Sequence, residues 1–135
     1  MNNKKIGNGF ETEMAQLLFR KGFWCHVMAS KTAGQPADII ASKDGHPFLI
    51  DAKVCSDDCF DLSRIEENQK NAMLLWDKTG NGQGYFALKM QSDGTIFMLD
   101  CFTALLHRQT RSTLPRVEVE QSAHTFDEWL KRVLT

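Results

Sequence analysis

Two short apolar runs on either side of Asp44-Gly45 constrain this chain more than any other feature of its sequence. Asp-Gly between such runs is a strong hairpin signal, because a tight primed turn requires positive φ at both central residues. If these two residues form the turn, Ile40 lies opposite Leu49. The same register places Asp38 directly opposite Asp51.

This register brings two carboxylates together in otherwise apolar strands. Side chains alternate along a strand, so Asp51 and Lys53 point to one face and Ala52 points to the other. Like charges directly opposite each other are destabilising, so the pair needs a compensating cation. Lys53 is one candidate, and a bound Mg²⁺ or Mn²⁺ is the other, because both metals prefer carboxylate oxygens. An exposed polar face with a surface ion pair is the alternative that the pattern leaves open.

The 135 residues predict a single domain over 1–135, with residues 1–8 as a flexible tail. A net charge of -1 gives no overall sign of nucleic-acid binding, so any DNA contact has to come from local patches. No Cys-x-x-Cys pair occurs among the four cysteines. Cys55 and Cys59, four residues apart, are weak evidence for a metal site, and buried, reduced thiols are predicted instead. No apolar run has the length of a membrane span and no signal peptide is recognisable, which predicts a cytoplasmic protein.

A helix is predicted from about Gly9 to Lys21, because apolar side chains recur there at helical spacing: Phe10, Met14, Leu17 and Leu18. Glu11 and Glu13 border this stripe on opposite sides. Either could reach a neighbouring site, and helical geometry does not choose between them. Stabilising the helix dipole is the alternative role for both. Phe19 lies on the far side of the helix and is a candidate for a partner surface.

A buried strand is predicted at 23–28. The polar loop at 30–36 follows it, and Lys31 in this loop is a candidate phosphate contact. A second acid-free stretch at 101–117 carries three further candidates: Arg108, Arg111 and Arg116. An ordinary solvated surface is the alternative for both stretches.

A second helix is predicted to begin at Ser63, because residues 63–66 fit a capping box. Gln69 falls in the middle of its apolar stripe, and a polar amide aimed inward needs partners. Gln69 is therefore either a satisfied core residue or a group that reaches the paired carboxylates. Arg64 and Lys70 flank it as candidate phosphate contacts.

The rest of the chain predicts a second hairpin, with strands at 85–90 and 95–99. A short helix follows from Asp100 to about Arg108. A short edge strand is predicted at 117–119, and a capping box at Thr125 opens the terminal helix.

The order of an acid-bearing helix, an acidic hairpin and a Gln-bearing helix resembles the PD-(D/E)XK nucleases. Pro36-Ala37-Asp38 is followed, after twelve intervening residues, by Asp51-Ala52-Lys53. Gly7 to Glu11 resembles the opening of Holliday junction resolvases of the archaeal Hjc and bacterial RecU types. Three segments look most like the RecU type: 49–53, 60–65 and 67–69. The likeness covers roughly residues 7–90, and the long stalk insertion of RecU-type enzymes is absent.

This resemblance implies an α/β (α+β) fold with a restriction-endonuclease-like core, in which helices flank a central mixed sheet of about five strands. It implies a homodimeric, Mg²⁺-dependent endodeoxyribonuclease acting on DNA in recombination and repair, with Mn²⁺ as a possible substitute. The implied metal ligands are Glu11, rather than Glu13, together with Asp38, Asp51 and the backbone carbonyl of Ala52.

Lys53 is implied as the catalytic lysine, and Gln69 corresponds to a polar catalytic-site residue on the following helix. The expected DNA contacts are Lys31, Arg64, Lys70, Arg108, Arg111 and Arg116. Another endonuclease of the same superfamily, acting on duplex or flap DNA, is one alternative function. A DNA-structure-binding module without catalysis is the other. The four histidines lack clustered metal-ligand spacing, and no Gly-rich phosphate loop precedes a helix.

Overall fold

The computed structural model describes residues 3–28 and 37–134. Five α-helices and eight strands alternate along the described chain: α1 (Asn3–Arg20), β1 (Trp24–Val27), β2 (Ile39–Lys43), β3 (His46–Cys55), β4 (Cys59–Asp61), α2 (Glu67–Trp76), β5 (Tyr85–Met90), β6 (Ile96–Asp100), α3 (Cys101–Arg108), β7 (Thr113–Pro115), α4 (Arg116–Ser122), β8 (His124–Thr125) and α5 (Phe126–Val133). Three short helical turns link them: η1 (Ser56–Asp58), η2 (Leu62–Arg64) and η3 (Asp77–Asn81).

Six strands form the central sheet in the order β1-β2-β3-β5-β6-β8, and β4 pairs with β7 beside it. The sheet is mixed, because β3 and β5 are parallel while its other neighbours are antiparallel. A parallel pair needs a crossover connection, and α2 lies in that connection. The predicted mixed sheet is confirmed, with β8 as an additional edge strand.

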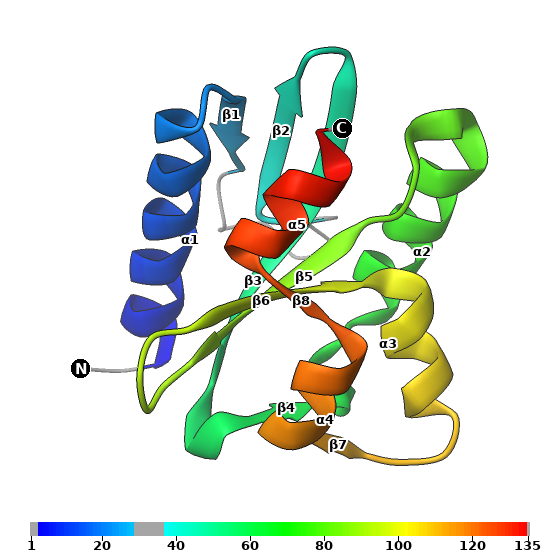
Figure 1. Ribbon diagram of the computed structural model, residues 1–135. Helices are drawn as coiled ribbons and strands as arrows, with labels where there is room; N and C mark the ends of the chain where they lie inside the picture. The colour runs from blue at the N-terminus through cyan, green and yellow to red at the C-terminus, as the bar shows by residue number, and fades with distance from the viewer. Residues whose placement is uncertain (1–2, 29–36, 135) are drawn as a thin grey trace.

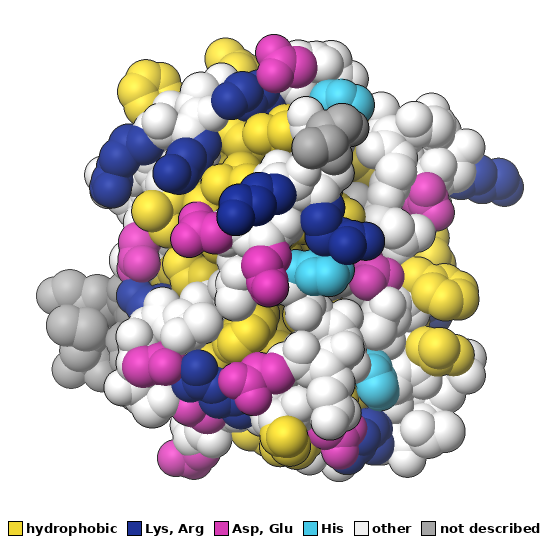
Figure 2. All heavy atoms as spheres, in the orientation of Figure 1, with side chains coloured by type: hydrophobic (Ala, Val, Ile, Leu, Met, Phe, Trp, Pro, Cys, Tyr) yellow, Lys and Arg dark blue, Asp and Glu magenta, His cyan; other side chains and the backbone are white. Residues whose placement is uncertain are grey.

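Helices cover both faces of this sheet. Figure 1 shows α1 on one side of the strands and α2 and α3 on the other, with α5 crossing in front. The core beneath α1 and α5 includes Phe10, Met14 and Trp129, and the Trp129 ring lies 5.1 Å from that of Phe48. Charged side chains of both signs cover the visible surface, and Lys and Arg gather over the upper end of α1 and over α5 (Figure 2).

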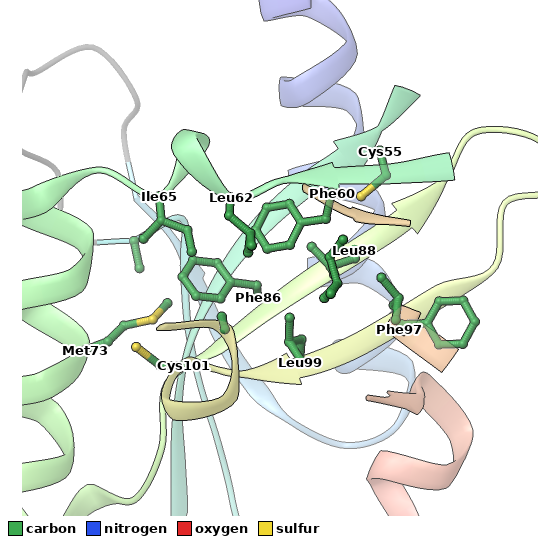
Figure 3. Packing of buried hydrophobic residues seen from close by; sticks show 14 of the residues in the cluster. Cys55, Phe60, Leu62, Ile65, Met73, Phe86, Leu88, Phe97, Leu99 and Cys101 are labelled. Atoms are coloured by element: carbon green, nitrogen blue, oxygen red, sulfur yellow. The ribbon is translucent and has the colours of Figure 1, made fainter. Parts of the chain in front are cut away.

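The second core lies on the other face of the sheet, beneath α2 and α3. Figure 3 shows Phe60, Leu62 and Phe86 packed together in it, and the rings of Phe60 and Phe86 are 5.9 Å apart. Phe60 and Leu62 belong to the stretch 55–62, which also contains three acidic residues: Asp57, Asp58 and Asp61. The two are fully buried, because the short pair β4–β7 folds this stretch back over the sheet.

Helix α1 begins at Asn3, so residues 3–8 are helical where a tail was predicted. Glycine is a poor helix former, and two glycines at positions 7 and 9 made an earlier start seem unfavourable. The prediction of an edge strand at 117–119 is wrong. This segment lies in α4, which buries Val119 and leaves Val117 exposed, and the nearby edge strand is β7. The alternation Val-Glu-Val-Glu fits a strand locally, but burial of a single valine is also what a short amphipathic helix produces.

The prediction of a buried strand at 23–28 is also wrong. Strand β1 lies at the edge of the sheet, where Trp24 is 64% exposed and Val27 is 38% exposed. Periodicity alone cannot separate an apolar edge strand from a buried one. The prediction of buried thiols holds for Cys55 and Cys101, whereas Cys25 and Cys59 are partly exposed. Within the described residues, no helix is both long and apolar enough to span a bilayer.

Two glycines with opposite surroundings give a test of this packing. A Cβ atom on Gly84 would lie 2.6 Å from Met73 Cγ and 3.0 Å from Met73 Cβ, whereas a Cβ atom on Gly9 in α1 would meet nothing within 4 Å. We expect Gly84→Ala to lower the free energy of unfolding by about 1–3 kcal/mol through overpacking. We expect Gly9→Ala to raise it by up to about 1 kcal/mol through helix propensity. Urea denaturation measures both, and equal effects of the two substitutions would contradict the packing around Met73.

Candidate active site

The predicted hairpin forms with the predicted register. Asp44 and Gly45 both have positive φ, at 52° and 79°, as a primed turn requires. Ile40 pairs with Leu49 across β2 and β3, and the regular pairing ends at Ile39 and Ile50. Beyond that pair the Asp38 amide donates to the Ile50 carbonyl at 3.1 Å, one residue out of the register. Turn chemistry and the two-residue period of the strands therefore bring Asp38 beside Asp51 at the start of β2.

Both carboxylates are removed from water. Asp38 is 9% exposed and Asp51 is 1% exposed, on the face of the sheet that α2 covers. Asp38 Oδ2 accepts a hydrogen bond of 2.8 Å from the Ala52 amide, which orients it toward β3. The alternative of an exposed polar face with a surface ion pair is therefore wrong.

Asp51 has a different partner on each oxygen. Its Oδ1 accepts a hydrogen bond of 3.1 Å from Gln69 Nε2, and its Oδ2 lies 2.8 Å from Lys53 Nζ. The ion pair with Lys53 is not a well-directed hydrogen bond, so Oδ2 is buried without a hydrogen-bond donor among the described residues. Lys53 is itself only 8% exposed. One site thus brings together four residues that the sequence placed near one another: Asp38, Asp51, Lys53 and Gln69.

Glu11 joins this group from α1. Burial is the main cause that raises the pKa of Glu11, and the negative charge of Asp51 acts in the same direction. A hydrogen bond to the Asp38 side chain and the positive charge of Lys53 act in the opposite direction on this pKa. Glu13 points elsewhere and forms an ion pair with Lys89 at 2.5 Å. Of the two glutamates, Glu11 is therefore the one that lies beside the paired carboxylates.

The carboxylate cluster is electrostatically unfavourable as it stands. The pKa of Asp38 is raised to about 8, first by burial and then by the negative charge of Asp51 and a side-chain hydrogen bond with it. The hydrogen bond from the Ala52 amide acts in the opposite direction, and the negative charge of Glu11 adds a smaller increase. A cation that replaced the proton on Asp38 would relieve the same repulsion. This is the environment in which a divalent metal is held by carboxylates.

The residues fit such a metal in part. Within the described chain, no three His, Cys, Asp or Glu side chains surround a common point as a finished metal cage. Mg²⁺ needs only one or two protein carboxylates, because waters and substrate phosphate fill its other positions. Asp38 and Asp51 supply these hard oxygen ligands, and the unsatisfied Oδ2 of Asp51 is an available one. The donor set therefore suits Mg²⁺ or Mn²⁺ rather than a softer metal.

Gln69 owes its position to the start of α2. This helix begins at Glu67 rather than near Ser63, because Asp61 caps the separate turn η2. The Gln69 carbonyl oxygen accepts a hydrogen bond of 3.2 Å from the Glu66 amide, while its NH₂ group donates to Asp51. Both ends of the amide are used, so Gln69 satisfies the capping requirement of α2 and also holds a site carboxylate.

The predicted phosphate contacts are largely occupied within the protein. Arg64 donates to the Val54 carbonyl at 2.8 Å, Arg108 donates to the Ile65 carbonyl at 3.2 Å, and Lys70 lies 3.5 Å from Glu67. Arg111 forms a two-point ion pair with Glu118. Arg116 contacts three acids: Asp58, Asp93 and Glu120. Lys31 lies outside the described residues.

Sequence reasoning did not anticipate these acids around the arginines. The stretch 101–117 contains no acid of its own, but the fold brings Asp58 and Asp93 to it from distant positions. The side chains of Arg111 and Arg116 are partly buried, and their charges are paired with acids of the protein. This pairing favours a structural role over a DNA contact. A second feature that was missed is the exposed ring pair of Trp24 and His26 on β1, for which the only sequence signal was two aromatic rings two residues apart.

A family model agrees with this arrangement over nearly the whole chain. The model that describes the archaeal Holliday junction resolvase (Hjc) matches residues 2–133. The chain belongs to the archaeal Hjc family. Nucleases of the Hjc family generally depend on a divalent metal, in keeping with the paired carboxylates.

The fold is similar to that of a solved Hjc protein. The structure is titled "1.6A resolution structure of Archaeoglobus fulgidus Hjc, a Holliday junction resolvase from an archaeal hyperthermophile". The TM-score is 0.70 at 17% sequence identity, and the match covers 91% of this chain and 98% of that chain. At this identity the likeness establishes the Hjc fold. No curated protein sequence matches the chain.

The raised pKa of Asp38 leads to a prediction about stability in the absence of metal. The pKa of this carboxyl is about 8 in the folded chain and about 3.8 in the unfolded chain, so the folded state binds more protons between these values. Its contribution to stability is therefore lost as the pH rises from about 4 to about 8. Asn at this position stays neutral and keeps an oxygen for the Ala52 amide.

We expect Asp38→Asn to have a higher melting temperature than the wild type at pH 8 in EDTA, with the difference shrinking toward pH 5. Adding Mg²⁺ at pH 8 should raise the melting temperature of the wild type and leave that of the variant unchanged, because the variant lacks a metal ligand. Thermal unfolding followed by circular dichroism measures both effects. A difference that is the same at pH 5 and pH 8 would contradict the repulsion among the carboxylates.

Proposed function

We propose that this protein is a divalent-metal-dependent endonuclease that resolves four-way DNA junctions. The observation that carries the proposal is the buried pair of Asp38 and Asp51 with Lys53 2.8 Å from Asp51. Membership of the Hjc family supports the junction as substrate. A module that only binds DNA has no use for a destabilising carboxylate cluster, so the catalytic reading is favoured.

Mg²⁺ is the proposed metal, with Mn²⁺ as a substitute. Asp38 and Asp51 would hold it, and Glu11 and the Ala52 carbonyl would complete the protein ligands. A metal in this site lowers the pKa of a bound water and clamps the scissile phosphate. The side chains of the site exclude bulk water from this position, because Asp38, Asp51 and Lys53 are each at most 9% exposed.

Lys53 acts as the fixed cation of the site. Its ammonium group lies on the same strand as Asp51, two residues along, and on the same face. With Asp38 and Asp51 holding a divalent cation, this ammonium group would be available to face the attacking water and the developing negative charge. A fixed cation there stabilises the transition state more than the ground state.

Gln69 positions Asp51 rather than reacting itself. Its NH₂ group donates to Asp51 Oδ1, which leaves Oδ2 directed to the cation. Contacts with the DNA backbone are expected mainly from Arg64 and Lys70 beside the site, with Lys31 as a further candidate. Such contacts set the register of the DNA and carry little sequence information.

We propose a homodimer that uses the outer faces of α2 and α3. These neighbouring helices expose four large apolar side chains, which are 45–63% exposed: Leu74, Leu75, Phe102 and Leu106. Apolar surface of this kind marks protein contacts. A second copy suits a two-fold symmetric junction, because each of the two cuts needs its own site. Phe19, which is 73% exposed on α1, stays a predicted partner contact. The proposed DNA substrate of this protein supports the predicted cytoplasmic location.

Cleavage of a panel of four-way junctions, flaps and linear duplexes with Mg²⁺ tests the proposal. We expect paired, symmetric nicks in the junction and much slower cleavage of the linear duplex. Mn²⁺ should substitute for Mg²⁺, and EDTA should abolish cleavage. Faster cleavage of flaps or duplexes would favour another endonuclease of the same superfamily, and binding without any product would favour a DNA-binding module.

Substitution of the site lysine separates catalysis from binding. We expect Lys53→Ala to lower the cleavage rate by at least about 100-fold, because the fixed cation is lost at the developing charge. Binding of the junction should change little, since Lys53 is 8% exposed and makes its contact inside the protein. Lys78→Ala, in the exposed turn η3, is the matched control and should cleave like the wild type. Cleavage by Lys53→Ala at the wild-type rate would contradict the proposed role of Lys53 in catalysis.

The two glutamates of α1 give a second comparison within one helix. We expect Glu11→Gln to lower the cleavage rate by about 10–100-fold and to raise the Mg²⁺ concentration needed for half-maximal rate, because a carboxylate beside the metal is lost. Glu13→Gln should change the rate by less than about twofold, because its ion pair with Lys89 is partly exposed. Measuring rate against Mg²⁺ concentration for both variants checks this. The opposite ranking would mean that Glu13 is the site residue.

A further inference from the structure

Two aromatic rings are stacked in the open at the edge of the sheet. The rings of Trp24 and His26 on β1 have centroids 6.5 Å apart and an interplanar angle of 17°. Trp24 is 64% exposed, and His26 is exposed as well. A tryptophan this exposed contributes little to the fold, so its face is available to another molecule.

This ring pair lies on the same face of the sheet as the site. Trp24 pairs with Ser42 and His26 pairs with Ile40. Ile40 and Ser42 pair in turn with Leu49 and Pro47, which lie two and four residues before Asp51 on β3, so the ring pair and Asp51 are on one face. At about 3.3 Å per residue, His26 and Trp24 are level with points about 7 Å and about 13 Å along the strand from Asp51.

The chain that leads into the ring pair suits a phosphate backbone, because no acid lies between Met14 and Met28 in the described chain. Two exposed basic residues, Arg20 and Lys21, lie four and three residues before Trp24, and Arg20 lines the groove on the other face of β1. Figure 2 shows basic side chains gathered around that end of the helix. Aromatic rings bind unpaired bases because every base has a face that can stack, and a basic surface nearby attracts the phosphate backbone.

The polar surroundings of the rings argue against a protein partner. Partner-binding surfaces are contiguous apolar patches. On this strand the apolar residues point the other way, because Cys25 and Val27 line a groove of about 320 Å³ together with Phe19 and Thr12 of α1. The face that carries Trp24 and His26 is aromatic and polar, which suits a base better than an apolar side chain.

We propose that Trp24 and His26 form a stacking platform for a base at the branch point of the DNA. This proposal rests on the proposed function, because it places the platform beside the strand that is cut. The bases of a continuous duplex are stacked on both sides, whereas a branch point offers bases with an open face. The platform therefore selects branched DNA over linear duplex and sets the distance from the branch to the cut.

Three variants test the platform: Trp24→Ala, Trp24→Phe and the control Val117→Ala. Val117 is an apolar residue of similar exposure that lies on α4. Binding is measured with a four-way junction and a linear duplex in Ca²⁺, which replaces Mg²⁺ so that the DNA stays intact. A second junction carries 2-aminopurine at the branch point, and its fluorescence reports stacking.

We expect Trp24→Ala to weaken junction binding by about tenfold and duplex binding by less than about twofold, in line with the loss of one stacked base. Trp24→Phe should stay within about threefold of the wild type, because phenylalanine keeps a ring. Val117→Ala should bind both DNAs normally. The wild type should quench 2-aminopurine on binding, and Trp24→Ala should not.

Three results would overturn the platform. Trp24→Ala could bind the junction like the wild type, could lose junction and duplex binding equally without a change in 2-aminopurine signal, or could turn a dimer into a monomer in sedimentation. The last result would make β1 a protein interface. Wild-type cleavage distinguishes the two proposals. If the wild type cleaves junctions and Trp24→Ala binds DNA like the wild type, only the platform is contradicted. If the wild type quenches 2-aminopurine but cleaves no DNA, only the nuclease function is contradicted.

Discussion

The repulsion between two buried carboxylates on the two sides of a hairpin is the strongest constraint on this structure. Asp38 and Asp51 are brought together by the turn at Asp44-Gly45, and both are buried from water. The Ala52 amide and Lys53 partly offset the repulsion, yet the pKa of Asp38 is still raised to about 8. Perturbed carboxyl groups of this kind cluster at functional sites, because a fold optimised for stability alone has no reason to keep them. The site therefore carries excess negative charge, which a bound divalent metal would neutralise.

The features that the sequence predicted correctly are those set by short-range rules. The hairpin register follows from turn chemistry and from the two-residue strand period, so Asp38, Asp51 and Lys53 were placed without knowledge of the fold. Gln69 was found because a polar residue stood out in an apolar helical stripe. The choice of Glu11 over Glu13 needed either a family resemblance or the structure, because both lie on the borders of the same stripe. Only tertiary packing decides which border faces the sheet edge.

The errors arose where distant parts of the chain decide the outcome. Strand β1 has the composition of a core strand, but no element covers its outer edge, and Trp24 is left exposed. The run of arginines at 108–116 is free of acids in sequence and surrounded by acids in space, because η1 and the β5–β6 turn bring Asp58 and Asp93 to Arg116. A local charge pattern therefore says little about a surface until the fold supplies its neighbours. With a net charge of -1, this protein has to bind DNA through the immediate surroundings of the site.

Gln69 shows how the fold and the site share one side chain. A capping box at Ser63 looks complete in the sequence, but the chain instead forms the turn η2 and delays α2 to Glu67. This later start gives Gln69 the third helical position, where its carbonyl oxygen caps the Glu66 amide and its NH₂ group is left to face Asp51. A start at Ser63 would place Gln69 within the helix, away from any free backbone amide, so only one end of its side chain would be fixed. The position of the helix start therefore determines how firmly a site carboxylate is held, which links a local choice of secondary structure to the geometry of the site.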